Sequence, residues 1–351
     1  MKMVDQVVAS TAPGDAVTEQ TFAWRGLLRH WGFDSEVIAE HVHPGFAPHV
    51  LHLDRAKARL RRAQAVIVHY SVWSRVITAA KRAPGAFALA YHNITPPELL
   101  QKYNPPLAAL CDRARKALPE LRGCTLAVAD SSFNAEDLRE AGIEPVSVVP
   151  LLLNLPLRPL PHEGASATNP LVLFVGRIVP NKRLEDALDA FRQYQTRHAR
   201  RARFVIVGSD DGFERYRSDL KQLASKIGAE RVTFAGRVSR EERDDLYRQA
   251  SVYLSTSVHE GFCAPVVEAL AHGIPVVARA AGAVPETLGE AGIVLDTQDA
   301  SVFADALHEA VTSPETRASV AAAGASRLRE LQPENVGRRL RAALEPLLES
   351  L

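Results

Sequence analysis

Two segments of this 351-residue chain combine cations, glycines and carboxylates in a spacing that suits a diphosphate and a sugar. The first reads Gly-Arg-Ile-Val-Pro-Asn-Lys-Arg over 176–183, directly after an apolar run. Gly176 lets the backbone approach a ligand, and Arg177 and Lys182 supply a planar fork and a point charge for phosphate oxygens. Such cations would stabilise the charge that develops on a departing diphosphate. An ordinary basic turn between a strand and a helix is the alternative interpretation.

The second segment, 255–273, carries two glutamates around an expected helix start. Pro265 and Gly273 predict a helix between them, because proline is favoured at the first helical position and glycine just past the end. Amides at that helix N-terminus could donate to sugar or phosphate oxygens. We expect Glu268 to accept from two ribose hydroxyls, and Glu260 to accept from hydroxyls of a transferred sugar. The residues expected at the helix N-terminus are Gly261, Phe262, Cys263 and Ala264.

The elements that would position these segments follow from an alternation along the whole chain. Short apolar or β-branched runs alternate with amphipathic stretches of helical length, which predicts α/β architecture with parallel sheets and crossover helices. Residues 154–169 are rich in proline, glycine and small residues without periodicity, and this stretch is the expected linker. The expected strands are 6–10, 35–39, 65–69, 86–91, 126–129 and 146–149 in the first half, and 171–175, 204–207, 232–235, 252–255, 275–278 and 292–295 in the second.

Together the two segments resemble the donor-binding signatures of the family 4 retaining glycosyltransferases. Residues 91–96 resemble a segment of bacterial members that act on surface polysaccharides. The matching patterns are Gly-Arg-x4-Lys-Arg at 176–183 and Glu-Gly-Phe-x2-Pro-x2-Glu-Ala at 260–269. The resemblance covers the C-terminal half and implies the GT-B fold, two Rossmann-like domains that face a central cleft. It implies an acceptor-binding domain over 1–153, a donor-binding domain over 170–332, and a helix over 333–351 that crosses back to the first domain.

The resemblance also implies further donor contacts. Gly208 and the turn that contains Arg237 and Val238 would lie near the nucleotide base, with plain strand-to-helix turns as the alternative. Gly14 would bring backbone amides to the donor phosphates from the first domain. His92 matches a histidine that contacts the transferred sugar or positions the acceptor, and a histidine that caps its own loop is the alternative. The implied catalytic set is Glu260, His92, Arg177 and Lys182.

The implied function is metal-independent transfer of a hexose, with retention, from a nucleotide-diphosphate sugar to a glycan or lipid-linked acceptor. The donor would be a UDP- or GDP-sugar and the pathway surface polysaccharide or glycoconjugate synthesis. In the front-face mechanism of this family the leaving phosphate oxygen takes the acceptor proton, so Glu260 orients rather than attacks. The metal-binding D-x-D pattern of the other common transferase fold is absent from the sequence, and we expect no metal or cofactor. A GT-B phosphorylase, a nucleotide-sugar epimerase and a non-catalytic nucleotide-sugar-binding protein remain alternatives.

Composition and charge indicate where the protein is located and what it can bind. Three cysteines without C-x-x-C spacing argue against a disulfide framework or a zinc site, and no apolar run reaches the length of a membrane span. An acid at position 5 interrupts any signal peptide, so we expect a cytoplasmic protein. Residues 55–122 hold thirteen Lys or Arg against three acids. This basic stretch is either a solvated helix face or a patch for anionic lipid at the inner face of the plasma membrane. No nucleic-acid-binding module accompanies the charge.

Overall fold

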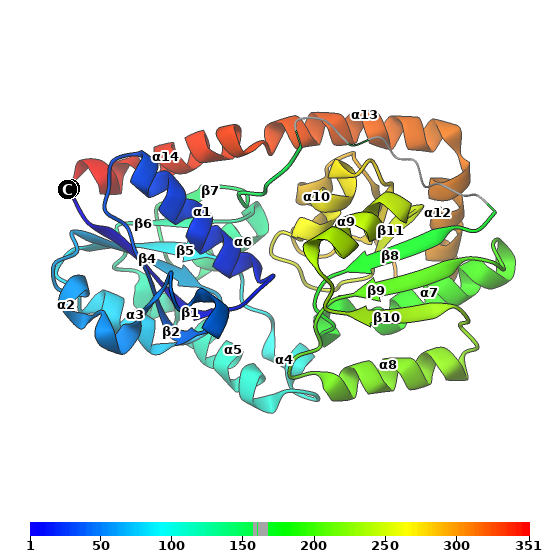
Figure 1. The fold of residues 1–351 in the computed structure, drawn as a ribbon, viewed down its shortest axis with the longest axis horizontal. Helices are drawn as coiled ribbons and strands as arrows, with labels where there is room; N and C mark the ends of the chain where they lie inside the picture. The colour runs from blue at the N-terminus through cyan, green and yellow to red at the C-terminus, as the bar shows by residue number, and fades with distance from the viewer. Residues whose placement is uncertain (157–159, 161–167) are drawn as a thin grey trace. The chain divides into compact units, whose positions relative to one another are not determined.

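The computed structural model describes residues 1–156, 160 and 168–351, and these residues form two compact units (Figure 1). Unit 1 comprises Met1–Pro97, Pro106–Leu153 and Pro333–Leu351, and unit 2 comprises Glu98–Pro105 and Asn154–Gln332. Of the expected linker 154–169, residues 157–159 and 161–167 lie outside the described residues.

Unit 1 is built on a seven-stranded sheet in the order β3-β2-β1-β4-β5-β6-β7, in which every neighbouring pair is parallel. The strands are β1 Val4–Thr11, β2 Val37–Val42, β3 Leu51–His52, β4 Ala65–Tyr70, β5 Ala86–Tyr91, β6 Leu126–Ala129 and β7 Val146–Val148. The helices are α1 Ala16–His30, α2 Lys57–Leu60, α3 Arg75–Lys81, α5 Pro105–Ala117, α6 Ser132–Glu140 and α14 Pro333–Glu349. The short helix α4 Pro97–Leu100 starts at the last residue before Glu98–Pro105 and lies mostly in unit 2.

The C-terminal helix α14 is part of the core of unit 1. Its residues Leu340, Leu344 and Leu347 are fully buried in one cluster with Trp24 and Leu28 of α1, with Val4 of β1, and with alternate residues of β4, β5 and β6. Figure 1 shows α14 and α1 side by side in this unit. The amphipathic period of α14 buries one face against the sheet, and apolar burial of this kind is the main stabilising contribution. The expected return of the C-terminal helix to the first domain is confirmed.

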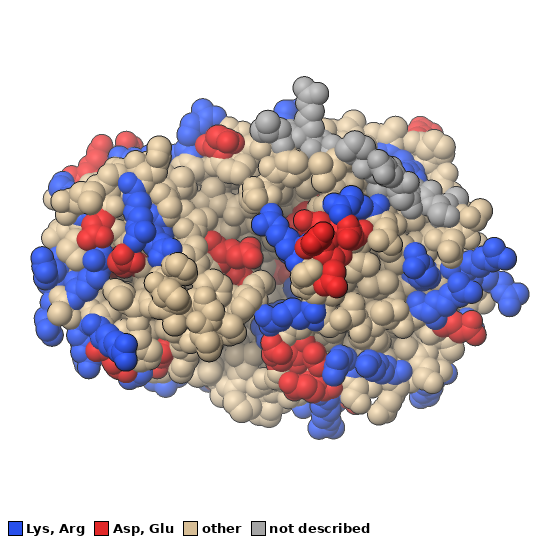
Figure 2. Space-filling view, in the orientation of Figure 1, with Lys and Arg blue, Asp and Glu red and all other residues tan. Residues whose placement is uncertain are grey.

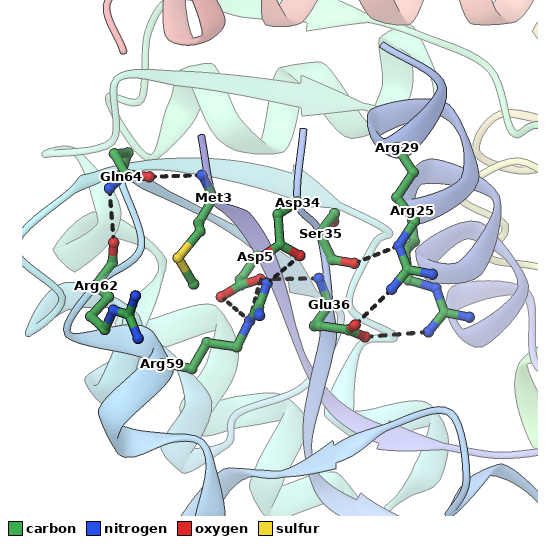
Figure 3. A network of polar contacts seen from close by, with 10 residues as sticks. All are labelled: Met3, Asp5, Arg25, Arg29, Asp34, Ser35, Glu36, Arg59, Arg62 and Gln64. Atoms are coloured by element: carbon green, nitrogen blue, oxygen red, sulfur yellow. Dashed lines mark hydrogen bonds and ion pairs between the residues drawn. The ribbon is translucent and has the colours of Figure 1, made fainter. Parts of the chain in front are cut away.

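At the amino ends of the strands of unit 1, a polar network surrounds Asp5 of β1 (Figure 3). The Asp5 side chain is fully buried and accepts from the guanidinium of Arg59 at 2.8–3.0 Å and from the amide of Glu36 at 3.0 Å. Arg59 also contacts Asp34 at 2.9 Å. This network joins β1, β2 and the α2 segment at the end of the sheet opposite to the strand carboxyl ends.

Unit 2 is built on a six-stranded sheet in the order β10-β9-β8-β11-β12-β13, also parallel throughout. The strands are β8 Leu171–Val175, β9 Arg203–Val207, β10 Val232–Gly236, β11 Val252–Ser255, β12 Val276–Arg279 and β13 Ile293–Leu295. The helices are α7 Leu184–Arg197, α8 Glu214–Lys226, α9 Arg240–Gln249, α10 Ala264–Ala271, α11 Val284–Leu288, α12 Ala300–Thr312 and α13 Pro314–Glu330.

The expected two parallel sheets are confirmed, and the strand assignments differ from the expectation only in detail. The second strand starts at Val37 instead of residue 35, and β3 was not anticipated. The two residues of β3 carry no apolar alternation, because Leu51 is exposed and His52 is half-buried. Each expected strand of the second half lies within one residue of the observed bounds, since these strands are short runs rich in apolar and β-branched residues.

Candidate functional site

Both sequence segments lie at the switch point of the unit 2 sheet. β8 and β11 are neighbours at its centre, and the chain leaves β8 toward β9 on one side and β11 toward β12 on the other. In open parallel sheets the crevice at such a point, outside the carboxyl ends of the strands, is where ligands bind. The segment 176–183 follows β8 and the segment 256–263 follows β11. The topology therefore places both segments at the carboxyl ends of the two central strands.

Backbone and side-chain hydrogen bonds join the two segments directly. The amide of Val258 donates to the carbonyl of Asn181 at 2.9 Å, and the buried Asn181 side chain donates to the carbonyl of His259 at 3.1 Å. The hydroxyl of Thr256 donates to the carbonyl of Arg183 at 2.8 Å. Residues 78 positions apart in the sequence are thus held as one loop cluster.

Lys182 and Glu260 form an ion pair within this cluster. The Lys182 ammonium lies 2.8 Å from both carboxylate oxygens of Glu260, and the two side chains are only 18% and 8% exposed. Burial opposes the ammonium charge, but the Glu260 carboxylate outweighs it and raises the pKa of Lys182. Burial also raises the pKa of the Cys263 thiol well above its usual range, with a further contribution from Glu260. Lys182 is therefore a cation and Cys263 a neutral thiol at physiological pH.

Arg177 lies next to residues that follow β9. Its guanidinium carbon is 5.9 Å from the ring centre of Phe213. The pKa of Asp211 is lowered by a hydrogen bond from Ser209, and the charges of Arg237 and Arg177 lower it further. Arg237 also contacts Asp211 at 2.9 Å. Charged side chains from three consecutive strand ends thus gather in one region of unit 2.

A close approach of backbones explains the glycine at position 208. The residue has φ +151°, and a Cβ atom added there would lie 1.8 Å from the carbonyl oxygen of Gly176. The amide of Gly176 donates to Val207, and the amide of Gly208 donates to Gly236, both at 2.9 Å. Only glycine allows the ends of β8, β9 and β10 to pack this tightly.

The helix that follows Glu260 starts almost as expected. α10 begins at Ala264, so Pro265 is its second residue instead of its first, and Gly273 follows its C-cap with φ +67°. Cys263 is the N-cap and has the left-handed φ of 73°. The carbonyl of Glu260 accepts from the amide of Ala283 at 2.9 Å, and the carbonyl of Phe262 accepts from Thr287 at 2.6 Å. Residues 260–263 are thereby also held by Ala283, directly before α11, and by Thr287 within α11.

Glu268 lies in the second turn of α10, at the edge of this region. One carboxylate oxygen accepts from the hydroxyl of Tyr247 at 2.9 Å, and the other lies 3.6 Å from the guanidinium of Arg243. Its side chain is 25% exposed. Neither Tyr247 nor Arg243 was expected from the sequence, because they lie in another helix, α9, and match no local pattern.

The two expected site residues outside this region belong to unit 1. Gly14, with φ +69°, lies in the turn between β1 and α1. His92 follows β5 and is 3% exposed, and both its ring nitrogens are engaged at 2.8 Å, Nδ1 by Asp130 and Nε2 by His69. His69 contacts Gln6 in turn at 2.8 Å. Sequence reasoning missed Asp130 and Gln6, although Asp130 has the recognisable place of an acid directly after a buried strand.

Comparison with known proteins points to one family. Residues 161–327, just under half of the chain, match the family described as Glycosyl transferases group 1. This part of the chain is similar to that family. Similar proteins include the O-antigen chain mannosyltransferase B of Escherichia coli, which is 27% identical over 165 residues, 46% of this chain and 42% of the relative. The D-inositol 3-phosphate glycosyltransferase of Mycolicibacterium smegmatis is 35% identical over 150 residues, 42% of this chain and 33% of the relative.

These alignments span less than half the length of either relative. Similarity in fold extends further. The crystal structure of Anabaena HepE in complex with UDP and glucose aligns over 99% of this chain and 100% of that chain, with a TM-score of 0.80 at 18% identity. At this identity the likeness shows the fold alone, and it confirms the expected GT-B class.

Across residues 1–156, 160 and 168–351, no three His, Cys, Asp or Glu side chains gather as a metal ion would require. Within the same part of the chain, no helix combines the length and apolar character of a membrane span.

Proposed function

We propose that this chain is a retaining glycosyltransferase that moves a hexose from a nucleotide-diphosphate sugar to a glycan or lipid-linked acceptor. The observation that carries the proposal is the Lys182–Glu260 pair at the switch point of a domain similar to Glycosyl transferases group 1, with Arg177 on the same loop. The names of the two relatives agree, since both are transferases of a sugar. The Anabaena HepE structure of similar fold holds UDP and glucose, which supports a nucleotide sugar as donor.

The roles proposed for the site residues follow from charge and position. Arg177 and Lys182 would bind the diphosphate and stabilise the charge that it gains as the glycosidic bond breaks. The Glu260 carboxylate keeps Lys182 protonated, holds its ammonium in place, and accepts from a hydroxyl of the transferred sugar. The first amides of α10 would donate to the same ligand. In the front-face displacement the acceptor hydroxyl bonds to the anomeric carbon, and its proton passes to the departing phosphate oxygen.

The donor is proposed to be a UDP- or GDP-sugar, and the reaction to need no metal. Calorimetry of the purified chain with UDP, GDP and their glucose and mannose conjugates, with and without EDTA, tests both points. Binding of one nucleotide at micromolar affinity that EDTA leaves unchanged is the expected result. Loss of binding with EDTA and its return with a divalent ion would contradict metal independence.

Variants test the site itself. Lys182→Ala and Glu268→Ala should each weaken binding of the correct nucleotide sugar at least tenfold, because each removes a charge-assisted contact of about 1.5–3 kcal/mol. Lys226→Ala, at the exposed end of α8, is the matched control and should bind as wild type does. Unchanged affinity in both site variants would refute the donor site. Phosphate-dependent cleavage of a glycoside without nucleotide would identify a phosphorylase instead.

A contact with anionic membrane lipid is the second part of the proposal. Two cations of the basic stretch form ion pairs within unit 1: Arg59 pairs with Asp5, and Arg75 pairs with Glu40. Four of the remaining exposed cations lie in or beside α2: Arg55, Lys57, Arg61 and Arg62. Figure 2 shows Lys and Arg side chains at the left edge of the face, where Figure 1 labels α2. Co-sedimentation with phosphatidylserine vesicles at low salt, lost when these four become Ser, is the expected result. Equal sedimentation of the fourfold variant would contradict it.

A further inference from the structure

A row of four aromatic rings runs through unit 2 from β8 to the end of α10. The centroids of Phe174 and Tyr253 are 6.4 Å apart, those of Tyr253 and Tyr247 are 6.5 Å apart, and those of Tyr247 and His272 are 4.8 Å apart. The interplanar angles are 21°, 22° and 13°, and the first three rings are at most 2% exposed. Rings packed on both faces in a dense interior cannot turn without displacing their neighbours. The directions of the two tyrosine hydroxyls are therefore fixed.

The two tyrosines of this aromatic row form hydrogen bonds at or beside the two sequence segments. The Tyr253 hydroxyl donates to the carbonyl of Val175 at 3.0 Å, one residue before Gly176. The Tyr247 hydroxyl donates to Glu268 at 2.9 Å and lies 3.4 Å from the carbonyl of Pro265. The row thus supports the Gly176 turn through a backbone carbonyl, and α10 through a carboxylate.

The contacts of Glu268 leave it able to bind a ligand. A carboxylate has about four acceptor positions, and Tyr247 uses one of them. Arg243 lies opposite the other oxygen at 3.6 Å, beyond hydrogen-bond distance. Burial, together with the charge of Glu268, raises the pKa of Tyr247 well above its usual range, so the phenol stays a donor. His272 donates from Nδ1 to the Glu268 carbonyl at 2.8 Å and closes the row.

We propose that Tyr247 is a positioning residue, which fixes the Glu268 carboxylate in the orientation that accepts from the ribose hydroxyls of the donor nucleotide. This inference rests on the proposed function. Tyr247 itself is fully buried and need not contact the ligand. A carboxylate held by a rigid donor loses less conformational entropy on binding, and it discriminates more strongly against a sugar that lacks a hydroxyl.

The test compares ribonucleotides with deoxyribonucleotides. Dissociation constants for UDP, GDP and their 2′-deoxy forms are measured calorimetrically on wild type, Tyr247→Phe and Tyr253→Phe. Tyr253→Phe is the matched control, because it removes a buried hydroxyl of the same row that bonds to a backbone carbonyl instead of Glu268. We expect Tyr247→Phe to lower the preference for the ribonucleotide about tenfold, with little change for the deoxy form. Tyr253→Phe should keep the wild-type preference.

The outcomes separate this inference from the proposed function. If wild type binds neither UDP nor GDP, the proposed function fails. If wild type binds but shows no preference for ribose, or if Tyr247→Phe weakens both forms equally, Tyr247 is a structural residue only and the inference is overturned. The ratio of the dissociation constants for the deoxy and ribo forms is measured on wild type and depends on no variant. Circular dichroism establishes that each variant is folded.

Discussion

The ammonium of Lys182 lies 2.8 Å from each carboxylate oxygen of Glu260, across a loop contact that joins the ends of β8 and β11. A pair this buried is costly to break from one side, because the remaining charge is left without a partner. Lys182→Met should therefore lower the free energy of unfolding by about 3 kcal/mol. Lys182→Met combined with Glu260→Gln should recover most of that loss, while nucleotide-sugar binding stays weak in both.

Urea unfolding measures the change in the free energy of unfolding, and calorimetry measures the binding of nucleotide sugar. An additive loss of stability in the double variant would show that the two side chains do not act as a pair. Recovery of binding together with stability would show that the pair only supports the loop.

The close approach at Gly208 leads to a second prediction. Gly208→Ala would place a methyl group 1.8 Å from the Gly176 carbonyl oxygen, so the ends of β8 and β9 must move apart. We expect a stability loss of about 3 kcal/mol, the upper range for overpacking, together with weaker donor binding. Gly26→Ala in α1 is the matched control, because nothing lies within 4 Å of its added Cβ. That change should stabilise the helix by about 0.5–1 kcal/mol and leave binding unchanged.

The contact between His69 and His92 leads to a third prediction, on pH. Burial, with the neighbouring His92, holds the pKa of His69 well below its usual range. Below about pH 6.5 the unfolded chain binds a proton at this residue that the folded chain does not, so stability falls as pH falls. The slope from this residue is at most about 1.4 kcal/mol per pH unit.

His69→Gln should remove that slope between pH 7 and 5, and urea unfolding at several pH values measures it. Burial raises the pKa of Asp130, although His92 lowers it, and this raised pKa changes stability with pH in the opposite direction to His69. The informative quantity is therefore the difference between wild type and variant in how the free energy of unfolding changes with pH. His30→Gln, at the exposed end of α1, is the control. An unchanged slope in His69→Gln would contradict the prediction.

The sequence was sufficient to locate the strands and both segments of unit 2, because buried apolar runs that end in glycine turns are local signals. Contacts between distant residues were not accessible in this way. Tyr247 reaches Glu268 across 21 residues, and Asp130 reaches His92 across 38. The sequence also could not show that Arg59 and Arg75 of the basic stretch are used in ion pairs within unit 1.

The network around Asp5 supports a last prediction, one of stability without function (Figure 3). Asp5 is fully buried, so Arg59→Met leaves its carboxylate without a cationic partner, and we expect a loss of about 3–5 kcal/mol in the free energy of unfolding. Arg59→Met with Asp5→Asn should be more stable than Arg59→Met alone, because no unpaired charge is then buried. The network lies at the amino ends of the strands, whereas ligands of parallel sheets bind at the carboxyl ends. Below their unfolding temperature, both variants should therefore bind nucleotide sugar as wild type does.

Arg62→Met changes an exposed neighbour and is the control for the unfolding measurement. A loss of nucleotide-sugar affinity in the double variant would contradict the expectation that the Asp5 network plays no part in ligand binding.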